Sequence, residues 1–504
     1  MSKKYVVFKI VGFVLFFAIV GMLFTKVTWV FRGNGTESRE DILGFQNVDG
    51  EIDVILFGGS DVLRFYDPLE AWHQYGYTSY NYATSSAQAD MLRFYAEESR
   101  KTHKPSIYVF DLRTITFVND IVSESSLRNW SDSVSVFSFA RIKGIYSYLF
   151  NRDWSNVDVP SYFIDLFKYH TKYDSLASPY QWSYTNERNI KNVDKGFAPY
   201  INHTPFVRPV STEERGEISD KQLKALKELL DYCDNEHINV LFICSPIVIT
   251  EKDQMLMNSV SDYIVSRGYE FIDFNKLYDE IGIDFSTDYG DVNHVNYIGA
   301  LKFTDYFINL LIQKYNLPDH QEDKRYASWN VDYEAMAETR ASWLKATQNA
   351  VDNHLAAKQV GEKLPNIDNF LDWYVQLGND NYVLIIRINE MPKDLSPEHP
   401  FFKFASVYGI DSSQTACVGA WKGTKAIVTN SNELTIETKI GTDGGKGTDK
   451  CLISIENKEL SIAGRNYYND QYPIQIIVYD YNFKTVLDNV TLQFKPDEII
   501  TMIR

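Results

Sequence analysis

The spacing of apolar and polar residues divides the chain into three parts, and the first is an uncharged run near the N-terminus. It extends from Ile10 to Thr25 between Lys9 and Lys26. At 1.5 Å per residue it reaches roughly 24 Å, and snorkelling lysines would extend it toward the ~30 Å core of a bilayer. No small-x-small pattern follows, so we expect residues 1–31 to form a transmembrane signal anchor; a cleaved signal peptide is the alternative. Lysines before the run predict a single-pass protein of the cell membrane with a cytoplasmic N-terminus and an extracellular bulk.

In the second part, residues 51–320, short apolar runs alternate with amphipathic stretches after a polar tether at 32–50. Continuous apolar runs bounded by turn residues are typical of buried parallel strands, and a period of 3.6 is typical of helices. The runs that we expect to form strands are 53–57, 77–82, 107–111, 238–244 and 269–274. The alternation predicts an α/β fold with a mainly parallel sheet covered by helices on both faces. It fails between about 120 and 215, where we expect an insertion covering one end of the sheet.

The third part begins beyond Pro318, where the composition of the sequence changes. Residues 321–375 are rich in Ala, Glu, Lys and Gln and predict a helical connector. From 376 to 504, runs of β-branched and aromatic residues separated by turn residues predict a β-rich α+β domain.

Charge and cysteine content narrow the function classes. The net charge of −17 disfavours nucleic acid or an anionic membrane surface as the main partner, because both attract clustered Lys and Arg. The four cysteines have no metal-ligand spacing, and we expect neither a metal nor a cofactor. They are Cys233, Cys244, Cys417 and Cys451. Whether Cys417 and Cys451 form a disulfide is left open by the sequence.

One candidate for chemistry is a serine directly after a buried strand. The run 53–57 ends in Gly58-Gly59-Ser60. Reactive groups of α/β folds sit at the carboxyl ends of parallel strands, and glycines let the backbone turn tightly there. The N–H groups of a helix starting at this point would favour a developing oxyanion. A simple turn is the alternative meaning of Gly-Gly-Ser.

The second candidate is the pair Asp291 and His294 in a loop before a helix. A serine nucleophile needs a base to take its proton, and the base needs a group that holds its tautomer. An Asp and a His three positions apart can supply both. Together with Ser60 they predict a catalytic triad.

These segments resemble the SGNH/GDSL hydrolases, and among them the branch that includes DltD-like and polysaccharide O-acetylation proteins. The resemblance covers about residues 50–318 and rests on three blocks, 53–60, 79–88 and Asp288-Tyr-Gly-Asp-Val-Asn-His294 with its continuation to Ala300. It implies a three-layer α/β/α sandwich with a parallel sheet. It also implies Ser60 as nucleophile, His294 as general base and later acid, and Asp291 as the residue that orients the histidine.

The same resemblance implies an oxyanion hole made by the backbone N–H of Ser60 and that of Ala83 or Thr84; departures from the family pattern leave it either incomplete or completed by a side chain such as Asn81 or Gln88. The sequence departs from the family pattern in two places, and the oxyanion-hole segment is one of them. The second block has Ala83 where relatives often carry Gly, and no Gly-x-Asn-Asp block follows the third strand.

The other departure is Asp61, which follows Ser60 where relatives often carry Gly-Ser-Ser-His. We expect its carboxylate to point away as a helix-capping group; the alternative is that it disfavours an oxyanion.

The C-terminal region resembles the interleukin-like EMT inducer (ILEI) domain, with its pieces in a permuted order. The matching segments are 382–390 with 395–398, 417–423 and 473–479. This resemblance implies glycan binding with Trp421 as a stacking residue; a packing module with Trp421 in its core is the alternative.

The sequence therefore predicts a membrane-anchored serine esterase or O-acyltransferase. Its partners would be the membrane, an acylated polysaccharide or teichoic-acid-like polymer, and a membrane-bound acyltransferase. A non-catalytic surface protein with the same fold is the alternative from another class, and a phospholipase or thioesterase is the third.

Overall fold

The computed structural model describes residues 3–32, 38–179, 182, 190–377, 382–430, 435–440, 449–481, 485–495 and 499–504, with the backbone alone for 3–7 and 357. The chain forms two compact units, Met1–Thr347 and Gln348–Arg504. Residues 33–37 of the expected tether lie outside the described part.

The first unit begins with one long apolar helix, α1 (Lys3–Arg32). Within the described residues, its segment Phe8–Arg32 alone is long and apolar enough to cross a membrane, and none of its apolar 18-residue window is buried. The length before the helix enters the folded part, about 20 residues, is close to the ~30 Å of a hydrocarbon core. A signal sequence meets the same criteria of length and composition. The C-terminal end of the helix bears on the choice between an anchor and a signal sequence.

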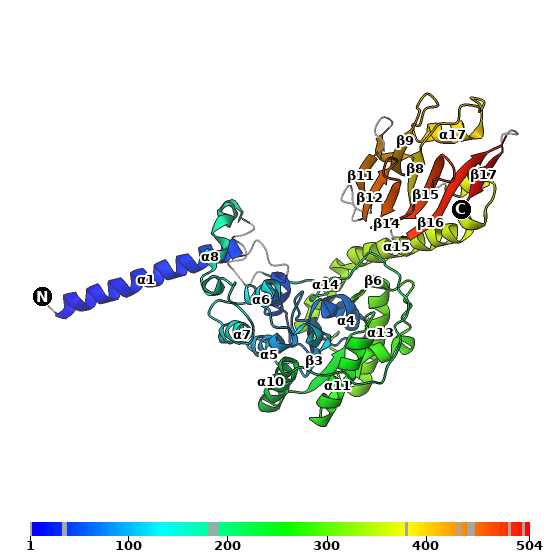
Figure 1. Ribbon diagram of the computed structural model, residues 1–504. Coiled ribbons are helices and arrows are strands. Elements are labelled where there is room, and N and C mark those ends of the chain that lie inside the picture. Colours follow the sequence, from blue (N-terminus) through cyan, green and yellow to red (C-terminus); the bar gives the residue numbers. More distant parts are fainter. Residues whose placement is uncertain are drawn as a thin grey trace. The chain divides into compact units, whose positions relative to one another are not determined.

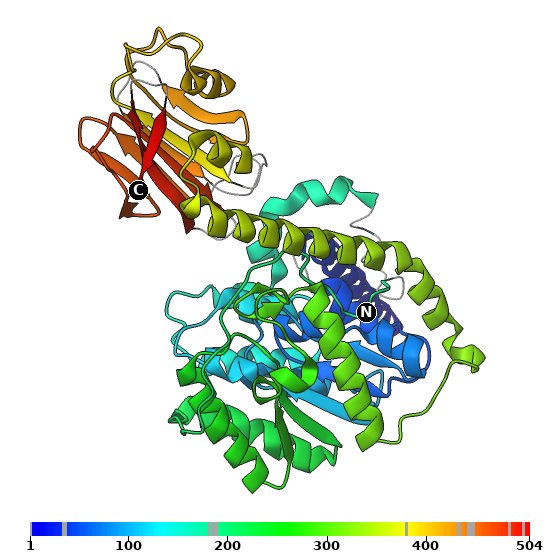
Figure 2. The same ribbon diagram turned by 90° about the vertical axis from the view of Figure 1, so that its right-hand side faces the viewer.

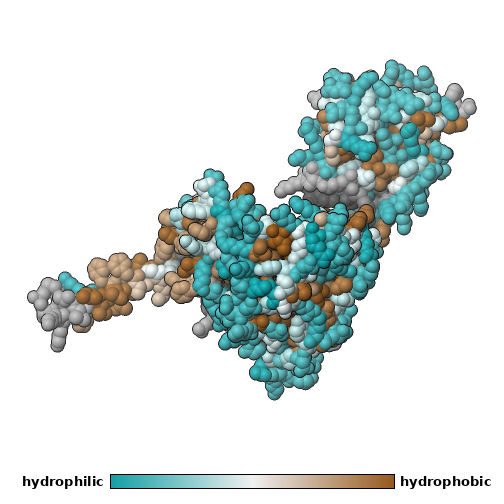
Figure 3. All heavy atoms as spheres, turned by 60° about the horizontal axis from the view of Figure 1, so that its bottom comes forward, coloured by the Kyte–Doolittle hydropathy of each residue, from teal (hydrophilic) through white to brown (hydrophobic). Residues whose placement is uncertain are grey.

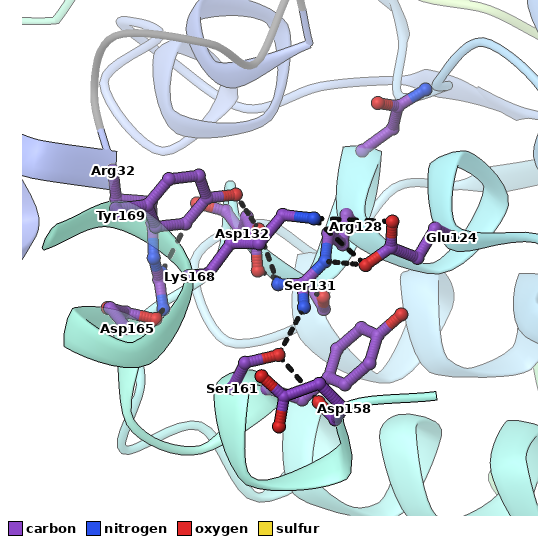
Figure 4. A network of polar contacts seen from close by, with 12 residues as sticks. Arg32, Glu124, Arg128, Ser131, Asp132, Asp158, Ser161, Asp165, Lys168 and Tyr169 are labelled. Carbon is purple, nitrogen blue, oxygen red and sulfur yellow. Dashed lines mark hydrogen bonds and ion pairs between the residues drawn. The ribbon is translucent and has the colours of Figure 1, made fainter. Parts of the chain in front are cut away.

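The last turn of α1 is buried in the globular part (Figure 4). Arg32 is fully buried, and its guanidinium donates to the Asp165 carboxylate at 2.9 Å and to the backbone carbonyl oxygens of Asp132 and Val134 at 3.2 and 2.9 Å. Trp29 packs against Leu43 and Ile190, and the Arg39 guanidinium stacks on its ring at 4.1 Å. The end of α1 is thus a structural part of the unit.

Removing the Arg32 guanidinium should destabilise the first unit. In Arg32→Ala the buried Asp165 carboxylate loses its ion partner, which costs about 3–5 kcal/mol. Urea unfolding of the full chain in detergent, followed by tryptophan fluorescence, measures this loss. Lys26→Ala, at an exposed position of the same helix, should leave the midpoint unchanged. Equal stability of the Arg32 variant and the parent would contradict the structural role of this ion pair.

A five-stranded, wholly parallel sheet forms the centre of the first unit, with helices around it (Figure 1). Its strands are β1 (Val54–Phe57), β2 (Ser79–Asn81), β3 (Ile107–Asp111), β4 (Val240–Cys244) and β5 (Glu270–Asp273). The order is β2-β1-β3-β4-β5, which confirms the expected α/β class. The order reverses at β1, and such switch points are where open α/β sheets bind ligands, beyond the carboxyl ends of the strands.

The strands form where the sequence is continuously apolar, since β1, β3 and β4 are buried along their whole length. The helices are α3 (Ser60–Phe65), α4 (Pro68–Tyr75), α5 (Leu92–Ser99), α10 (Asp220–Glu236), α11 (Glu251–Ser266), α12 (Tyr278–Ile281) and α13 (Tyr297–Lys314), with α2 (Arg39–Phe45) before the sheet. Four of the helices around the sheet, α4, α10, α11 and α13, begin after a residue whose side chain caps free N–H groups. Asn296 accepts from the N–H groups of Ile298 and Gly299, and Ser219 forms a capping box with Gln222.

The segment between β3 and α10 adds no strand to the sheet within its described residues. It contains η2 (Arg113–Phe117), α6 (Glu124–Ser131), α7 (Phe139–Phe150), η3 (Val159–Tyr162), α8 (Asp165–Tyr169) and η4 (His170–Ala177). Strands β3 and β4 nevertheless pair directly, so the segment is an insertion in the α/β order.

The expected connector at 321–375 is divided between the two units. Helix α14 (Ala327–Ala335) contacts α4 of the first unit, and the boundary between the units falls within the long helix α15 (Ala337–Lys363), drawn as one continuous ribbon in Figure 2. Helix α16 (Phe370–Gln376) contributes Phe370 and Trp373 to the core of the second unit.

The second unit is built on a six-stranded antiparallel sheet of order β10-β9-β8-β15-β16-β17. Its strands are β8 (Val383–Ile388), β9 (Cys417–Lys422), β10 (Lys425–Asn430), β15 (Ile474–Asp480), β16 (Thr485–Phe494) and β17 (Ile500–Ile503). One core joins this sheet to α16 and α17 (Pro400–Val407), and a second core joins it to a four-stranded sheet. The smaller sheet consists of β11 (Thr435–Ile440), β12 (Asp449–Ser454), β13 (Glu459–Ile462) and β14 (Arg465–Asn466). The C-terminal region is therefore β-rich, as the sequence predicts.

Candidate active site

Ser60 lies at the carboxyl end of β1, at the first position of α3. Two glycines precede it because larger residues would not fit. A Cβ on Gly58 would lie 2.5 Å from Val62 Cγ2, and one on Gly59 would lie 2.9 Å from Thr114 Cγ2. The Gly-Gly pair thus lets the chain turn from the sheet into the helix while neighbouring side chains pack directly against the backbone.

Asp291 and His294 face each other across a tight hairpin of β6 (Tyr289–Asp291) and β7 (His294–Val295). The two residues are register partners, with only Val292 and Asn293 between them. Opposed residues of an antiparallel pair project to the same side, which explains why a spacing of three brings the carboxylate to the imidazole. The Val248 N–H donates to the Val292 carbonyl oxygen at 3.0 Å and fixes the turn.

The structure brings the three predicted residues into one hydrogen-bonded chain. Ser60 Oγ lies 2.7 Å from His294 Nε2, and His294 Nδ1 lies 2.9 and 3.0 Å from the two carboxylate oxygens of Asp291. With Nδ1 protonated and donating to Asp291, Nε2 is free to accept the hydroxyl proton. The serine and the histidine are 234 positions apart, yet their geometry is that of a nucleophile and its base.

The environment of Asp291 keeps its carboxylate ionised. Partial burial on its own would raise the pKa of Asp291, but hydrogen bonding and attraction to His294, with a backbone N–H from Asn293, bring the pKa below its ordinary value. The side chain is 42% exposed. Asp291 can therefore hold the Nδ1 proton without taking it.

Asp61 does not point away as a helix-capping group, which corrects the sequence-based expectation. Its side chain is fully buried, makes no cap hydrogen bond and forms an ion pair with Arg113 at 3.2 Å. One carboxylate oxygen lies 3.8 Å from His294 Nε2. Burial behind the nucleophile is possible because the positive charge of Arg113 compensates the carboxylate.

Arg113 is a site residue that the sequence analysis did not single out. Its guanidinium also donates to the Asn293 side-chain oxygen in the turn between Asp291 and His294. It lies two residues beyond the buried strand β3, and a charged residue at that place was a usable signal. Arg113 thus joins the serine segment to the histidine hairpin.

A second buried carboxyl lies behind this pair. Asp111 ends β3 and accepts hydrogen bonds from the Ser245 hydroxyl and the Arg113 N–H. Burial, and then repulsion from Asp61, raise the pKa of Asp111 well above the ordinary carboxyl range. The floor of the site therefore contains two carboxyl groups, Asp61 and Asp111. Asp61 pairs with the Arg113 guanidinium, and Asp111 accepts from the Arg113 backbone N–H.

The expected oxyanion-hole residues differ in whether their N–H groups are free to bind an oxyanion. The Ser60 N–H lies in the first turn of α3, where helical N–H groups have no carbonyl partner within the helix. Ala83 and Thr84 follow β2 and are buried, and the Thr84 hydroxyl is paired with Tyr95 at 2.7 Å. The Asn81 amide donates to the Tyr66 and Gly196 carbonyl oxygens at 2.8 and 3.4 Å. The Asn81 amide N–H groups are thus committed to the fold and do not serve as oxyanion donors, whereas the buried Gln88 accepts from Arg152 through its amide oxygen, and its role in the hole stays a prediction.

The end of the insertion returns to the site, which sequence reasoning did not reveal. The Tyr200 ring lies 5.1 Å from the His294 ring, and the Arg64 guanidinium stacks on Tyr200 at 4.7 Å. The Tyr200 carbonyl accepts from the Tyr297 N–H, so the segment is tied to the start of α13. No sequence pattern marks Tyr200, since an aromatic residue in an irregular segment is ordinary.

Trp421, the candidate glycan contact, is 1% exposed and lies in a core of the second unit, which corrects that assignment. Its indole lies across Gly419, where a Cβ would come within 2.3 Å of the ring. A sugar-stacking residue must present a ring face to solvent, and this one does not. Cys417 and Cys451 are free, buried thiols, so they form no disulfide.

We expect Trp421→Ala to destabilise the second unit by about 3–5 kcal/mol, because it opens a cavity in a packed core. Urea unfolding of the full chain measures the loss, and Trp154→Ala, at a site 48% exposed, is the matched control with little expected change. Unchanged stability together with lost binding to a glycan would restore the stacking role.

Among the described residues, no group of three or more His, Cys, Asp or Glu side chains is arranged to hold a metal ion. No protein-family model matches the chain, and no curated protein matches it.

Proposed function

We propose that the chain is a membrane-anchored serine esterase or O-acyltransferase that acts on acyl groups of a cell-envelope or exported polysaccharide. The observation that carries the proposal is the chain Ser60 Oγ–His294 Nε2, Nδ1–Asp291 with distances of 2.7 and 2.9 Å. The parallel sheet with its switch point at β1 supports the three-layer SGNH-type sandwich that the sequence blocks resemble.

The proposed chemistry follows from the hydrogen bonds. His294 Nε2 takes the proton of Ser60 as Oγ attacks the ester carbonyl carbon, and Asp291 stabilises the imidazolium that forms. The Ser60 N–H, with an N–H of the Ala83–Thr84 segment, would bind the oxyanion. Collapse expels the alcohol, which takes the proton from His294 and leaves an acyl group on Ser60. Water or a sugar hydroxyl then accepts the acyl group by the same steps in reverse.

The anchor supports the choice of an envelope substrate. The buried end of α1 supports a helix that stays attached, because cleavage after Arg32 would remove the ion partner of the buried Asp165 carboxylate. An uncleaved helix with lysines at its start favours an outward-facing bulk. In that location an acylated polysaccharide or teichoic-acid-like polymer is the substrate, and a membrane-bound acyltransferase is the proposed donor of acyl groups.

Covalent labelling tests the serine directly. The full chain in detergent is treated with a fluorophosphonate, and we expect an adduct on the tryptic peptide that contains Ser60. Ser60→Ala should abolish the label, whereas Ser125→Ala, at an exposed serine, should keep it. No adduct on the parent chain, or an adduct that persists in Ser60→Ala, would overturn the enzymatic proposal. Comparing envelope acyl esters between cells with the parent gene and cells with Ser60→Ala then tests the polymer substrate.

A second candidate function is a non-catalytic surface protein of the same fold. Asp61 favours it, since a buried carboxylate directly after Ser60 and 3.8 Å from His294 Nε2 disfavours an oxyanion at this place. Silence toward fluorophosphonate in the parent chain, with intact folding, is the result that this candidate predicts.

A further inference from the structure

The insertion presents large apolar side chains to the outside of the first unit. Six of them, between 45% and 71% exposed, define what we call the aromatic face: Tyr146, Phe150, Trp154, Phe163, Phe167 and Tyr173. Single exposed apolar residues are normal on soluble proteins, whereas clustered ones mark an interaction surface.

The members of the aromatic face come together although they lie on separate elements. Tyr146 and Phe150 stack on α7 with ring centres 5.8 Å apart. Together with Trp154 and Phe163 they line an almost wholly apolar pocket of about 120 Å³. Phe167 lies on α8 and Tyr173 on η4, which directly follow η3. Four members of the face therefore line one pocket beside α7 and η3, and the other two lie on the elements that follow, α8 and η4.

This patch borders the point where α1 enters the unit. Helix α1 contacts both α8 and η4, and Figure 1 shows it leaving the unit beside α8. The junction is rigid, because Arg32 at the end of α1 is paired with Asp165 at the start of α8. Figure 3 shows apolar surface continuing from α1 onto the neighbouring part of the unit.

A polar network holds the elements of the face to that junction (Figure 4). Asp132 accepts from Arg128 at 3.3 Å and from the Tyr169 hydroxyl, and Arg128 also donates to Ser161 at 2.6 Å. Arg128 and Asp132 belong to the α6 segment, Ser161 to η3 and Tyr169 to α8. The position of the aromatic face relative to α1 is therefore fixed by buried ionic contacts.

We propose that the aromatic face rests in the headgroup region of the same bilayer that α1 crosses, as a second membrane contact of the first unit. The chemistry fits, because Phe, Tyr and Trp side chains are favoured at the boundary between hydrocarbon and water. Four of the six side chains lie on α7, α8 and η4, whose backbone groups are largely paired within the helices, so their burial in lipid leaves few polar groups unsatisfied. This inference rests on the proposed anchoring by α1 and is independent of the chemistry at Ser60.

Spin labelling measures the immersion. Phe150→Cys and Phe167→Cys are each labelled with a nitroxide in the full chain, reconstituted into nanodiscs of zwitterionic and anionic phospholipid. The four native cysteines are buried and do not compete for the label. Power-saturation measurements then compare access of apolar O₂ with access of a water-soluble nickel complex. The same label at Phe16→Cys in α1 and at Val265→Cys on α11, 57% exposed, provides the lipid and water references.

We expect at least a several-fold higher ratio of O₂ to nickel access at residues 150 and 167 than at 265, approaching the value at residue 16. Ratios at 150 and 167 equal to that at 265, with residue 16 in lipid, would overturn the inference while leaving the anchor intact. Low access to both reagents at 150 and 167 would indicate a protein partner or a second copy on the face and would also overturn it. Nickel access at residue 16 would refute the anchor itself.

Discussion

Ser60→Ala should lower the turnover of a small activated ester, such as p-nitrophenyl acetate, by about 10⁶-fold. The reason is that the variant has no hydroxyl 2.7 Å from His294 Nε2, so no acyl-enzyme can form. His294→Ala should cause a loss of similar size, because the hydroxyl proton then has no acceptor. Steady-state rates of the full chain in detergent give both values.

The double variant distinguishes a triad from two independent contributions. Residues that act as a unit give non-additive losses, so Ser60→Ala with His294→Ala should be about as slow as either single variant. Ser125→Ala should retain the parent rate. Turnover in Ser60→Ala equal to that of the parent would show that the measured ester hydrolysis occurs elsewhere.

Arg113→Met should cause the second large effect, on both stability and activity. The buried Asp61 carboxylate then loses its ion pair, which costs about 3–5 kcal/mol in unfolding free energy. The unbalanced charge, 3.8 Å from His294 Nε2, favours the imidazolium form and shifts the acid limb of the pH–rate profile to higher pH. Urea unfolding and the pH dependence of kcat/KM measure the two consequences.

Asp61→Asn on the Arg113→Met background provides the control. Because neither residue then carries a charge, we expect most of the lost stability to return and the acid limb to move back. If the double variant is as unstable as Arg113→Met alone, the arginine acts through its contact with Asn293 and not through charge balance. An unchanged pH profile in Arg113→Met would exclude the electrostatic role.

Much of the first unit could be predicted because its signals are local. The strands β1, β3 and β4 are apolar runs, and Asp111 at the end of β3 is the one charged position among them. The pairing of Asp291 with His294 could be predicted, because a two-residue hairpin places residues three positions apart on the same face. The pairing of His294 with Ser60 required only that both follow the same edge of a parallel sheet.

The errors concern burial, which sequence pattern does not determine. Aspartate is a residue type that often caps helices, but the Arg113 guanidinium, 52 positions later in the chain, pairs with the Asp61 side chain in the interior. Tryptophan is a residue type that often stacks on sugars, yet the Trp421 ring packs inside the core, in the space left by Gly419. The partner of Asp61 lies far outside the local window, and the core that encloses Trp421 is assembled from several elements, so the local sequence alone did not determine either orientation.

The junction at Arg32 has a consequence for how substrate must arrive. A flexible stalk would let an anchored enzyme sweep a wide volume above the lipid, whereas a helix clamped at its last turn allows almost no swivel. A tilt of α1 would therefore tilt the first unit with it. Under the proposed function, ester groups would be reached only within a narrow layer of fixed height, and the proposed polymer would have to be brought along the membrane to this layer.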